Sequence, residues 1–505
     1  MSPNCPSISV AKRQRTGAVQ QLAHLSAVPF NAKRLGLRQS PAAFERANRR
    51  RHFETLQAMR NRASVLIGLL WCVALLAVVV VGVLHTARMD LLTGKNFGDK
   101  IQARYLALAG IEKAEALLYQ NARDRSHSGK NHTGQLYNDP QDFREAAFGR
   151  GTYSVLRRGR DDEGGGVIYG VSDEESRLNV NTATSDELTK IQGLGSDMAT
   201  AILGWRGSGS TVAETDYYMA QRPPYKPRGA AFQTVRELLM VRGVTPDLLL
   251  AKDVHQNGLL EDLSDGANEP PKYQDTVSDD DLGWAGILTV DSAAKNVNAA
   301  GDDRVNIQTA DETSLTTVKG ITRDIARAMV AYRNQNRFQG IADLLDVTPP
   351  RNNGNVPNAR NNSTPPPGGS DSSGQRVIDE NLLMQIADDV TTTSDTTLSG
   401  AININTAAAK VLICMPGIDR DLAQKIISHR QSSGFFANPA ELLKVDGMTR
   451  DIFKQVAPLV TARSETFRIL AEGRVKSTGV RQRVQVIARV NLDGVKTLSY
   501  REDDL

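Results

Sequence analysis

An acidic run in this sequence has the residue types to do chemistry. Asp279, Asp280 and Asp281 supply carboxylates, the hard oxygen ligands that calcium prefers. Their spacing matches no calcium-loop motif, so a solvated acidic turn is the competing interpretation. The sequence contains no Ser/His/Asp, HExxH, P-loop or Gly-rich phosphate pattern, and its histidines are scattered. We therefore predict that the protein is not an enzyme. The sequence indicates no cofactor with certainty, and calcium is the one candidate.

A second candidate site is a motif that occurs three times, at residues 179–183, 306–310 and 403–407. Each copy is followed at the same distances by the same residue types. Twelve residues after Asn181, Gln308 and Asn405 come Gly193, Gly320 and Gly417, and thirteen residues later come Arg206, Arg333 and Arg430. Thr184 with Glu187 and Thr309 with Glu312 fit capping boxes, so we expect a short helix, a glycine with positive φ and a second helix in each copy.

These units resemble helix-hairpin-helix modules, which often bind DNA phosphates through backbone amides of the hairpin. Copy one keeps both hairpin glycines, Gly193 and Gly195, whereas the second glycine is lost after Gly320 and Gly417. An aspartate follows each hairpin, and phosphate binding relies on clustered Lys and Arg. A structural or protein-contact role is therefore expected, and DNA binding is the alternative.

A single apolar segment at residues 63–84 must anchor these modules. Its 22 residues carry no charge and span roughly 33 Å as a helix, enough for a bilayer core of about 30 Å. The segment begins too far from Met1 for a secretory signal peptide. We predict a membrane helix.

Charge predicts the orientation of this helix. Residues 1–62 hold 12 Lys or Arg and two Glu, a net charge of +10; the whole chain carries +4, so the remainder carries −6. The positive-inside rule places the basic flank in the cytoplasm and the large C-terminal part outside. A nucleic-acid or anionic-lipid contact is the other interpretation of the basic arm. Of the three cysteines, only Cys414 follows the membrane helix, which excludes a disulfide within the exported part.

The elements around the repeats predict an α+β fold. The apolar helix continues to about Asn121 as an amphipathic helix, with Ile101, Tyr105, Leu108 and Ile111 at helical intervals. Alternating apolar and polar residues predict antiparallel strands at 152–157, 167–171, 467–475, 480–490 and 496–500. We expect a pilin-like long helix packed on a small antiparallel sheet, with a large all-α insertion of helix-hairpin-helix repeats between its strands.

This combination of residues resembles the protein K family of minor pseudopilins in bacterial type II secretion (general secretion pathway protein K). The resemblance rests on the basic leader, the membrane helix continuing through residues 105–112, the short sheet and an insertion that opens with residues 178–183. It implies a single-pass inner-membrane protein with its large domain in the periplasm. It also implies a role at the tip of the pseudopilus, where the protein initiates and caps assembly. A membrane-anchored DNA-uptake receptor and a minor pilin of a related type IV pilus are the alternatives.

The resemblance implies a set of site residues and partners. A prepilin peptidase would cut between Ala63 and Ser64, and Val65, Leu66, Ile67, Gly68 and Leu69 would begin the helix that packs in the assembly. Gly68 stands where most pseudopilins carry a Glu, and a tip subunit can lose that Glu. The implied partners are I-type and J-type minor pseudopilins, the major pseudopilin, the prepilin peptidase and the inner-membrane secretion platform, with secreted substrate as a further candidate. Some members of the family bind calcium, which keeps Asp279, Asp280 and Asp281 as candidate ligands.

The domain organisation that we expect follows from these assignments. It comprises a basic cytoplasmic leader (1–63), a transmembrane helix (64–84), its amphipathic continuation (85–121), the first part of the sheet (122–177), helix-hairpin-helix unit 1 (178–257), a linker (258–303), unit 2 (304–350), a disordered linker (351–376), unit 3 (377–462) and the C-terminal strands (463–505).

Overall fold

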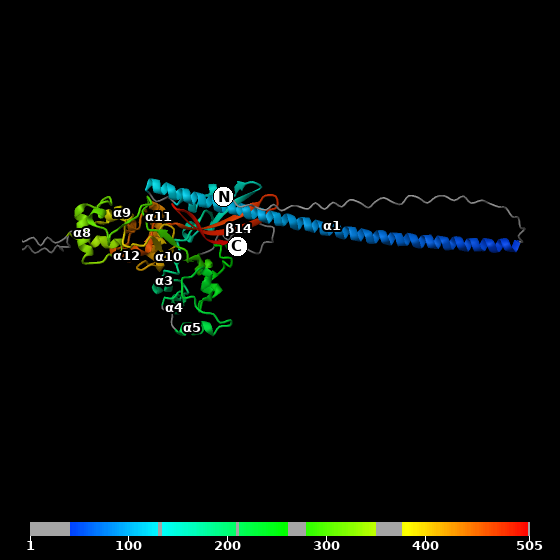
Figure 1. The fold of residues 1–505 in the computed structure, drawn as a ribbon, viewed down its shortest axis with the longest axis horizontal. Coiled ribbons are helices and arrows are strands. Elements are labelled where there is room, and N and C mark those ends of the chain that lie inside the picture. The colour runs from blue at the N-terminus through cyan, green and yellow to red at the C-terminus, as the bar shows by residue number, and fades with distance from the viewer. Residues whose placement is uncertain (1–40, 130–133, 209–211, 261–278, 350–375, 503–505) are drawn as a thin grey trace, which may run out of the picture. The chain divides into compact units, whose positions relative to one another are not determined.

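A computed structural model describes residues 41–129, 134–208, 212–260, 279–349 and 376–502 of the chain. The chain divides into two parts, one ending at Asp90 and one beginning at Leu91. One helix, α1 (Pro41–Ser128), has 88 residues and runs through the boundary (Figure 1). It begins inside the predicted leader and ends beyond Asn121, so both predicted ends were wrong. Residues 1–40 of the leader and almost all of the predicted disordered linker lie outside the described residues.

The first part contains the apolar stretch of α1. Its large apolar side chains, from Val65 to Leu84, are each 47–69% exposed. Within the described residues, α1 is the one helix long and apolar enough to cross a membrane, with a mean hydropathy of 3.0 over its most apolar stretch. Length and composition therefore agree with the predicted membrane helix.

The second part contains an antiparallel sheet whose strands come from both sides of the helical insertion. Its main order is β1-β2-β13-β14-β15, with β3 also paired to β2 and β4 to β13. In the register, Leu156 of β2 faces Leu470 of β13 across more than 300 residues of sequence. This confirms one sheet interrupted by a large insertion. The strands are β1 (Ala146–Phe148), β2 (Gly151–Arg158), β3 (Val167–Tyr169), β4 (Ser172–Asp173), β13 (Thr466–Val475), β14 (Arg481–Asn491) and β15 (Gly494–Arg501), and short helices η1 (Gln135–Tyr137), α2 (Pro140–Phe143) and η2 (Asp161–Glu163) connect them.

The C-terminal third of α1 covers this sheet with a face that overlaps the predicted one only in part. Ile101 and Tyr105 are 40% and 62% exposed, whereas Ala103 and Ala107 are fully buried. The helix presents small residues because its backbone lies close to β13: a Cβ on Gly473 would overlap Ala103 O and lie 2.5 Å from Ala107 N. The predicted stripe of large side chains was therefore only partly correct, since Ile111 and Leu118 do face the sheet.

The insertion consists of three units, and each opens and closes with a two-residue strand. The two strands of a unit pair in parallel: β5 with β6, β8 with β9 and β11 with β12. Unit 1 comprises β5 (Leu178–Asn179), α3 (Ser185–Thr189), α4 (Ser196–Trp205), α5 (Val212–Met219), η3 (Val235–Met240), α6 (Pro246–Leu250), η4 (Asp279–Leu282), η5 (Trp284–Gly286) and β6 (Leu288–Thr289).

Units 2 and 3 repeat this order in a shorter form. Unit 2 comprises β8 (Val305–Asn306), α7 (Glu312–Leu315), α8 (Arg323–Arg333), η6 (Ile341–Asp346), α9 (Glu380–Ile386) and β9 (Val390–Thr391). Unit 3 comprises β11 (Ile402–Asn403), α10 (Ala409–Cys414), α11 (Arg420–Ser433), η7 (Pro439–Lys444), α12 (Arg450–Val456), η8 (Ala457–Leu459) and β12 (Val460–Thr461). A separate ribbon, β7 (Ala293–Lys295) with β10 (Thr397–Ser399), joins segments between the units.

Two predicted domain boundaries were wrong. The closing strand of unit 1, β6, lies in the predicted 258–303 linker, and α9 with β9 completes unit 2 rather than opening unit 3. Val377 N also donates to Val347 O, which joins the two ends of unit 2 across the segment outside the described residues. After the second helix, each unit continues with a short 3₁₀ segment, namely η3, η6 and η7.

Two cores stabilise the second part. One apolar cluster runs through all three helical units, from Leu178 to Val460. The other lies between α1 and the sheet and contains Ile111, Val155 and Ile469. The three units therefore fold around a single shared core rather than as three independent modules.

Candidate assembly site

The repeated Asn and Arg of each unit tie the opening motif to the rest of the unit. Asn405 Nδ2 donates to Phe436 O at 3.0 Å, and Phe436 N donates back to Asn405 Oδ1 at 2.8 Å. Asn181 makes the same exchange with Phe232, and Gln308 Nε2 donates to Phe338 O. The identical spacing in the sequence thus reflects a hydrogen-bonded framework.

The arginines close the same loop from the other side. Arg430 Nη1 donates to Ile404 O at 3.0 Å and to Ala407 O at 2.8 Å. Arg206 and Arg333 donate to the corresponding two carbonyls of their own units. Within the described residues, Arg430 also forms an ion pair that the other two arginines lack. Its Nη2 pairs with Asp162 of η2 at 2.9 Å and thereby joins unit 3 to the sheet region. These arginines have a structural role that spacing alone did not reveal.

The hairpin glycines have the backbone conformation that the sequence predicted. Gly193, Gly320 and Gly417 have φ of 80°, 104° and 72°, where an L side chain is strained. A Cβ on Gly320 would lie 3.0 Å from Leu382, so this glycine lets α9 approach the hairpin. In unit 1 and unit 3 the facing side chains are Leu248 of α6 and Ile452 of α12. The hairpins are therefore packed against the closing helix of their own unit.

The helices that follow the hairpins differ in how their N-termini are capped. Thr322 and Asp419 cap α8 and α11 with their side chains, whereas Gly195 leaves α4 without a side-chain cap in the described structure. A side-chain cap occupies an amide that would otherwise bind phosphate, and Asp419 adds a negative charge. In unit 2 the predicted Thr309–Glu312 capping box was wrong, because Asp311 caps α7 by accepting from Ser314 N at 2.7 Å. The Thr184–Glu187 box of α3 is confirmed.

A buried acidic segment, Asp173 to Glu175, joins the sheet to the helical units. Asp173 Oδ2 accepts hydrogen bonds from Asn403 Nδ2 (3.0 Å), Ser464 Oγ (2.6 Å) and Thr406 Oγ1. Glu174 pairs with Arg468 of β13 at 2.6 Å, and Glu175 accepts from Thr466 N at 3.1 Å. The sequence signal for this junction was three consecutive acidic residues directly before the first motif, and the sequence analysis missed it.

Burial controls the charge of this junction. Burial raises the pKa of Glu175 well above its ordinary value, and the neighbouring Asp173 carboxylate raises it further. Burial also raises the pKa of Asp173, against the opposing effect of its hydrogen-bond donors. For Glu174 burial acts in the same upward direction, but the charges of Arg468 and Arg177 together with the hydrogen bonds from Thr289 and Arg468 outweigh it, and the pKa is lowered. We therefore expect Glu174 to be ionised and Glu175 to hold a proton more tightly than a free carboxyl does.

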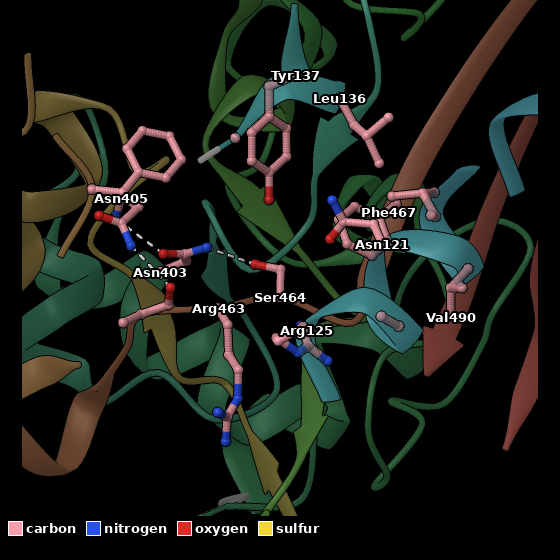
Figure 2. A pocket seen from close by; sticks show the side chains of 15 residues that line it. Asn121, Arg125, Leu136, Tyr137, Asn403, Asn405, Arg463, Ser464, Phe467 and Val490 are labelled. Atoms are coloured by element: carbon pink, nitrogen blue, oxygen red, sulfur yellow. Dashed lines mark hydrogen bonds between the residues drawn. The ribbon is translucent and has the colours of Figure 1, made fainter. Parts of the chain in front are cut away.

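A small cavity of about 60 Å³ lies beside this junction. Its lining comes from the end of α1, from η1 and from the loops around Asn403 and Ser464. Figure 2 shows the Tyr137 hydroxyl directed toward Asn403 and Ser464. Burial raises the pKa of Tyr137 well above its ordinary value, as do the charges of Asp173 and Glu175. The tyrosine therefore stays neutral and acts as a hydrogen-bonding group.

The predicted assembly residues lie together on α1. Ala63 and Ser64 are within the helix, and Val65, Leu66, Ile67 and Leu69 are 59–69% exposed. A Cβ at Gly68 would meet nothing within 4 Å, so this glycine is not required by packing inside the chain. Nothing in the structure tests the cleavage position itself, which stays a prediction.

The acidic run is only partly described. Asp281 pairs with Lys252 at 2.8 Å, and the side chains of Asp279 and Asp280 lie outside the described residues. Within the part of the chain that the structure covers, no group of three or more His, Cys, Asp or Glu side chains could hold a metal ion. Calcium binding at these aspartates stays untested.

Comparison with known proteins first identifies the class of the helical units. A family model described as "Helix-hairpin-helix motif" matches residues 301–349 and 399–461. These ranges cover the hairpins of units 2 and 3. The chain thus contains helix-hairpin-helix modules inserted into a helix-and-sheet framework, as the repeats predicted.

A second family model identifies unit 1. Residues 174–252 match the model described as "Type II secretion system (T2SS), protein K". The match begins at the buried acidic segment and extends past α6. Residues 174–252 are therefore similar to the protein K domain of type II secretion systems, which confirms the resemblance predicted from the sequence.

Two further similarities are more limited. The mouse (Mus musculus) "Endonuclease/exonuclease/phosphatase family domain-containing protein 1" is 28% identical over 174 residues, which cover 34% of this chain and 30% of the mouse protein. The crystal structure of the GspK-GspI-GspJ complex from the type 2 secretion system of enterotoxigenic Escherichia coli aligns with 83% of this chain and 99% of the matched chain. That alignment has 10% identity and a TM-score of 0.37, and a score of this size establishes no common fold.

Proposed function

We propose that this chain is a minor pseudopilin that helps to build the pseudopilus of a bacterial type II secretion system. The observation that carries the proposal is the protein K domain at residues 174–252, which is inserted between strands of a sheet that packs on α1. A single-pass anchor, an exported domain and non-catalytic assembly follow from this assignment. The protein would act by packing against other chains rather than by turning over a substrate.

The proposed location is the bacterial inner membrane, with the large domain in the periplasm. The length and apolar character of α1 support the anchor, and the +10 charge of residues 1–62 supports a cytoplasmic N-terminus. Partners of the proposed assembly are the I-type and J-type minor pseudopilins, the major pseudopilin and the inner-membrane platform. We propose that the complex initiates and caps the pseudopilus, and that secreted substrate is a further contact.

The proposed processing site lies between Ala63 and Ser64, where a prepilin peptidase would remove the leader. The absence of a Glu at Gly68 supports a place at the tip, since such a Glu would be an unpaired charge in lipid if no neighbour lay beyond it. An Ala63→Phe variant should keep the leader attached, because the peptidase requires a small residue before the cut. N-terminal sequencing of the membrane-extracted protein measures this, with Ala58→Phe as the matched control. A variant shortened to the normal length would refute the cleavage position.

The functional test is secretion by the native host. Deleting the gene should leave exported proteins in the periplasm, and the full chain expressed in trans should restore their release. The Ala63→Phe variant should fail to restore it while accumulating to normal amounts, and Ala58→Phe should restore it. Normal secretion in the deletion strain would contradict the proposal.

DNA binding is the second candidate function, and one observation favours it. The N-terminus of α4 follows a hairpin with two glycines and has no side-chain cap in the described structure, which leaves backbone amides available to phosphate. The purified full chain in detergent can be titrated with duplex DNA at several salt concentrations. Tight binding that weakens steeply with salt would support the DNA-uptake function, and its absence would support the assembly function.

A further inference from the structure

A second cavity, of about 90 Å³, lies where unit 1 meets the sheet. Its walls come from the end of β2, the segment between β4 and β5, the loop after α6 and the helix η5. Five arginines line it: Arg157, Arg158, Arg160, Arg177 and Arg468. This density of guanidinium groups around one small cavity predicts a strongly positive interior unless each is paired.

Four of the five arginines are paired with carboxylates. Arg157 pairs with Glu163 at 2.7 Å and Arg468 with Glu174 at 2.6 Å, while Arg158 and Arg160 pair with Asp161 and Asp162. Arg177 differs, because in the described part of the chain it forms no salt bridge, and its Nη1 donates to the backbone oxygen of Ala285 at 3.1 Å. Burial lowers the pKa of Arg177 to about 10 and the charge of Arg468 acts in the same direction, whereas the carboxylates of Glu174, Asp253 and Asp173 act in the opposite direction. Arg177 therefore remains a cation at neutral pH without a carboxylate of the described chain in direct contact.

An amide donor without a partner lies in the same wall. Asn257 is 5% exposed, and its Oδ1 accepts from Leu259 N at 2.8 Å, which sets the orientation of the amide. Its Nδ2 atom is buried and has no hydrogen-bond partner in the described part of the chain. A buried donor of this kind costs free energy unless a ligand or water accepts from it.

The loop that presents Asn257 is held from several sides. Asp253 accepts from Asn257 N at 3.1 Å and from Gly258 N at 2.8 Å. Arg501 of β15 donates to His255 O at 2.8 Å, and Arg236 donates to the Gln256 side chain at 2.8 Å. The loop that carries Asn257 in the cavity wall is thus held in place by the surrounding structure.

We propose that this cavity binds a small oxyanion, with the Arg177 guanidinium and Asn257 Nδ2 as its donors. The one carboxylate in the lining, Asp173, already accepts from Asn403, Thr406 and Ser464, so it does not satisfy these two donors. The cavity volume of about 90 Å³ accommodates a group larger than one water molecule, which suits a small oxyanion such as sulfate, phosphate or acetate. The bound anion would join unit 1 to the sheet.

Thermal unfolding of the full chain in detergent tests this proposal. Sodium sulfate, phosphate or acetate is exchanged for sodium gluconate at constant ionic strength and pH, because gluconate is bulkier than any of the three anions. The unfolding midpoint should rise by about 5 °C when the anion is present at about 100 times its dissociation constant, and the rise should saturate. The three anions distinguish tetrahedral oxyanions from carboxylates as the ligand.

Two variants separate specific binding from the general effect of salt. Arg177→Gln removes the cation, and Asn257→Asp keeps the bond from Leu259 N but replaces the donor with a negative charge. Both should lose the saturable rise while keeping any general stabilisation by sulfate. Arg323→Gln, at an exposed arginine of α8, should respond like the wild type. The proposal would be overturned if the unfolding midpoint of the wild type showed no saturable rise, or if it rose equally in all variants. In either case the cavity would hold water rather than an anion.

Discussion

The three equivalent arginines of the repeat units allow a prediction with internal controls. Arg206, Arg333 and Arg430 each donate to the same two carbonyls of their unit. Arg430 alone of the three is also 4% exposed and paired with Asp162. Replacing each by Met removes the same local bonds but leaves different groups unsatisfied. The burial and ion pairing of each arginine, rather than its place in the motif, should therefore determine how much the free energy of unfolding falls.

The magnitude follows from the groups left behind. A buried polar group without a partner costs about 1–3 kcal/mol. In Arg430→Met, two buried carbonyls lose their donor and Asp162 loses one of its two arginines, so we expect a loss of about 3–5 kcal/mol in the free energy of unfolding. Arg333 is half-buried and water can reach its carbonyls, so Arg333→Met should cost about 1–2 kcal/mol.

Thermal unfolding of the full chain in detergent measures these losses. At roughly 2 °C per kcal/mol, Arg430→Met should lower the unfolding midpoint by about 6–10 °C and Arg333→Met by about 2–4 °C. Arg323→Met, an exposed position on the same helix as Arg333, should change it by less than about 1 °C. Equal losses in Arg333→Met and Arg430→Met would refute the reasoning, because the two arginines make the same local hydrogen bonds and differ only in burial and ion pairing.

Three further predictions concern the second part of the chain. The pKa of Glu175 is raised in the folded state, so the contribution of this carboxyl to stability is complete below its ordinary pKa of 4.5 and is lost as pH rises through the folded value. The Glu175→Gln variant does not titrate and should not show this loss. The unfolding midpoint of the variant should therefore exceed that of the wild type by a margin that grows from pH 5 to pH 8. A wild type and a variant with parallel pH profiles would contradict this. Gly473→Ala should lower the unfolding midpoint by more than 5 °C, because the new Cβ would overlap the α1 backbone. Gly479 has open space around it, so Gly479→Ala should lose only the stability that corresponds to the strain of its φ of 73°. Thermal unfolding followed by circular dichroism compares the two variants, and equal losses would argue against close helix–sheet packing. Burial raises the pKa of Cys414 to about 11, so alkylation at pH 7 should require unfolding; mass spectrometry of the native and denatured chain checks this, and fast native labelling would disprove it.

Much of the architecture could be predicted from local patterns. The strands on both sides of the insertion were visible as alternating apolar residues, and the hairpin glycines were visible as repeated positions that need positive φ. The apolar helix was visible from length and charge alone. The candidate assembly residues from Ala63 to Leu69 could be named only through a resemblance, since packing against other chains leaves no mark on the structure of one chain.

Other features depended on contacts between distant residues. The opening strand of each unit was hidden because it has two residues, too few for a periodic signal, and its partner lies at the far end of the unit. The assignment of α9 to unit 2 depended on the parallel pairing of β8 with β9. The buried segment from Asp173 to Glu175 was not recognised from the sequence, because only the folded chain supplies its donors.

The sequence by itself determined which segments are apolar, alternating or repeated, since these properties depend on residue type and spacing along the chain. It therefore determined the long apolar helix, the divided sheet and the threefold insertion. The tertiary structure decided which face of α1 is buried, because the close approach at Gly473 brings the backbone at Ala103 and Ala107, and not Ile101 or Tyr105, against the sheet. It also decided that Arg430 and Asp173 are partners of distant elements, because burial and pairing are properties of the surroundings and not of the residue.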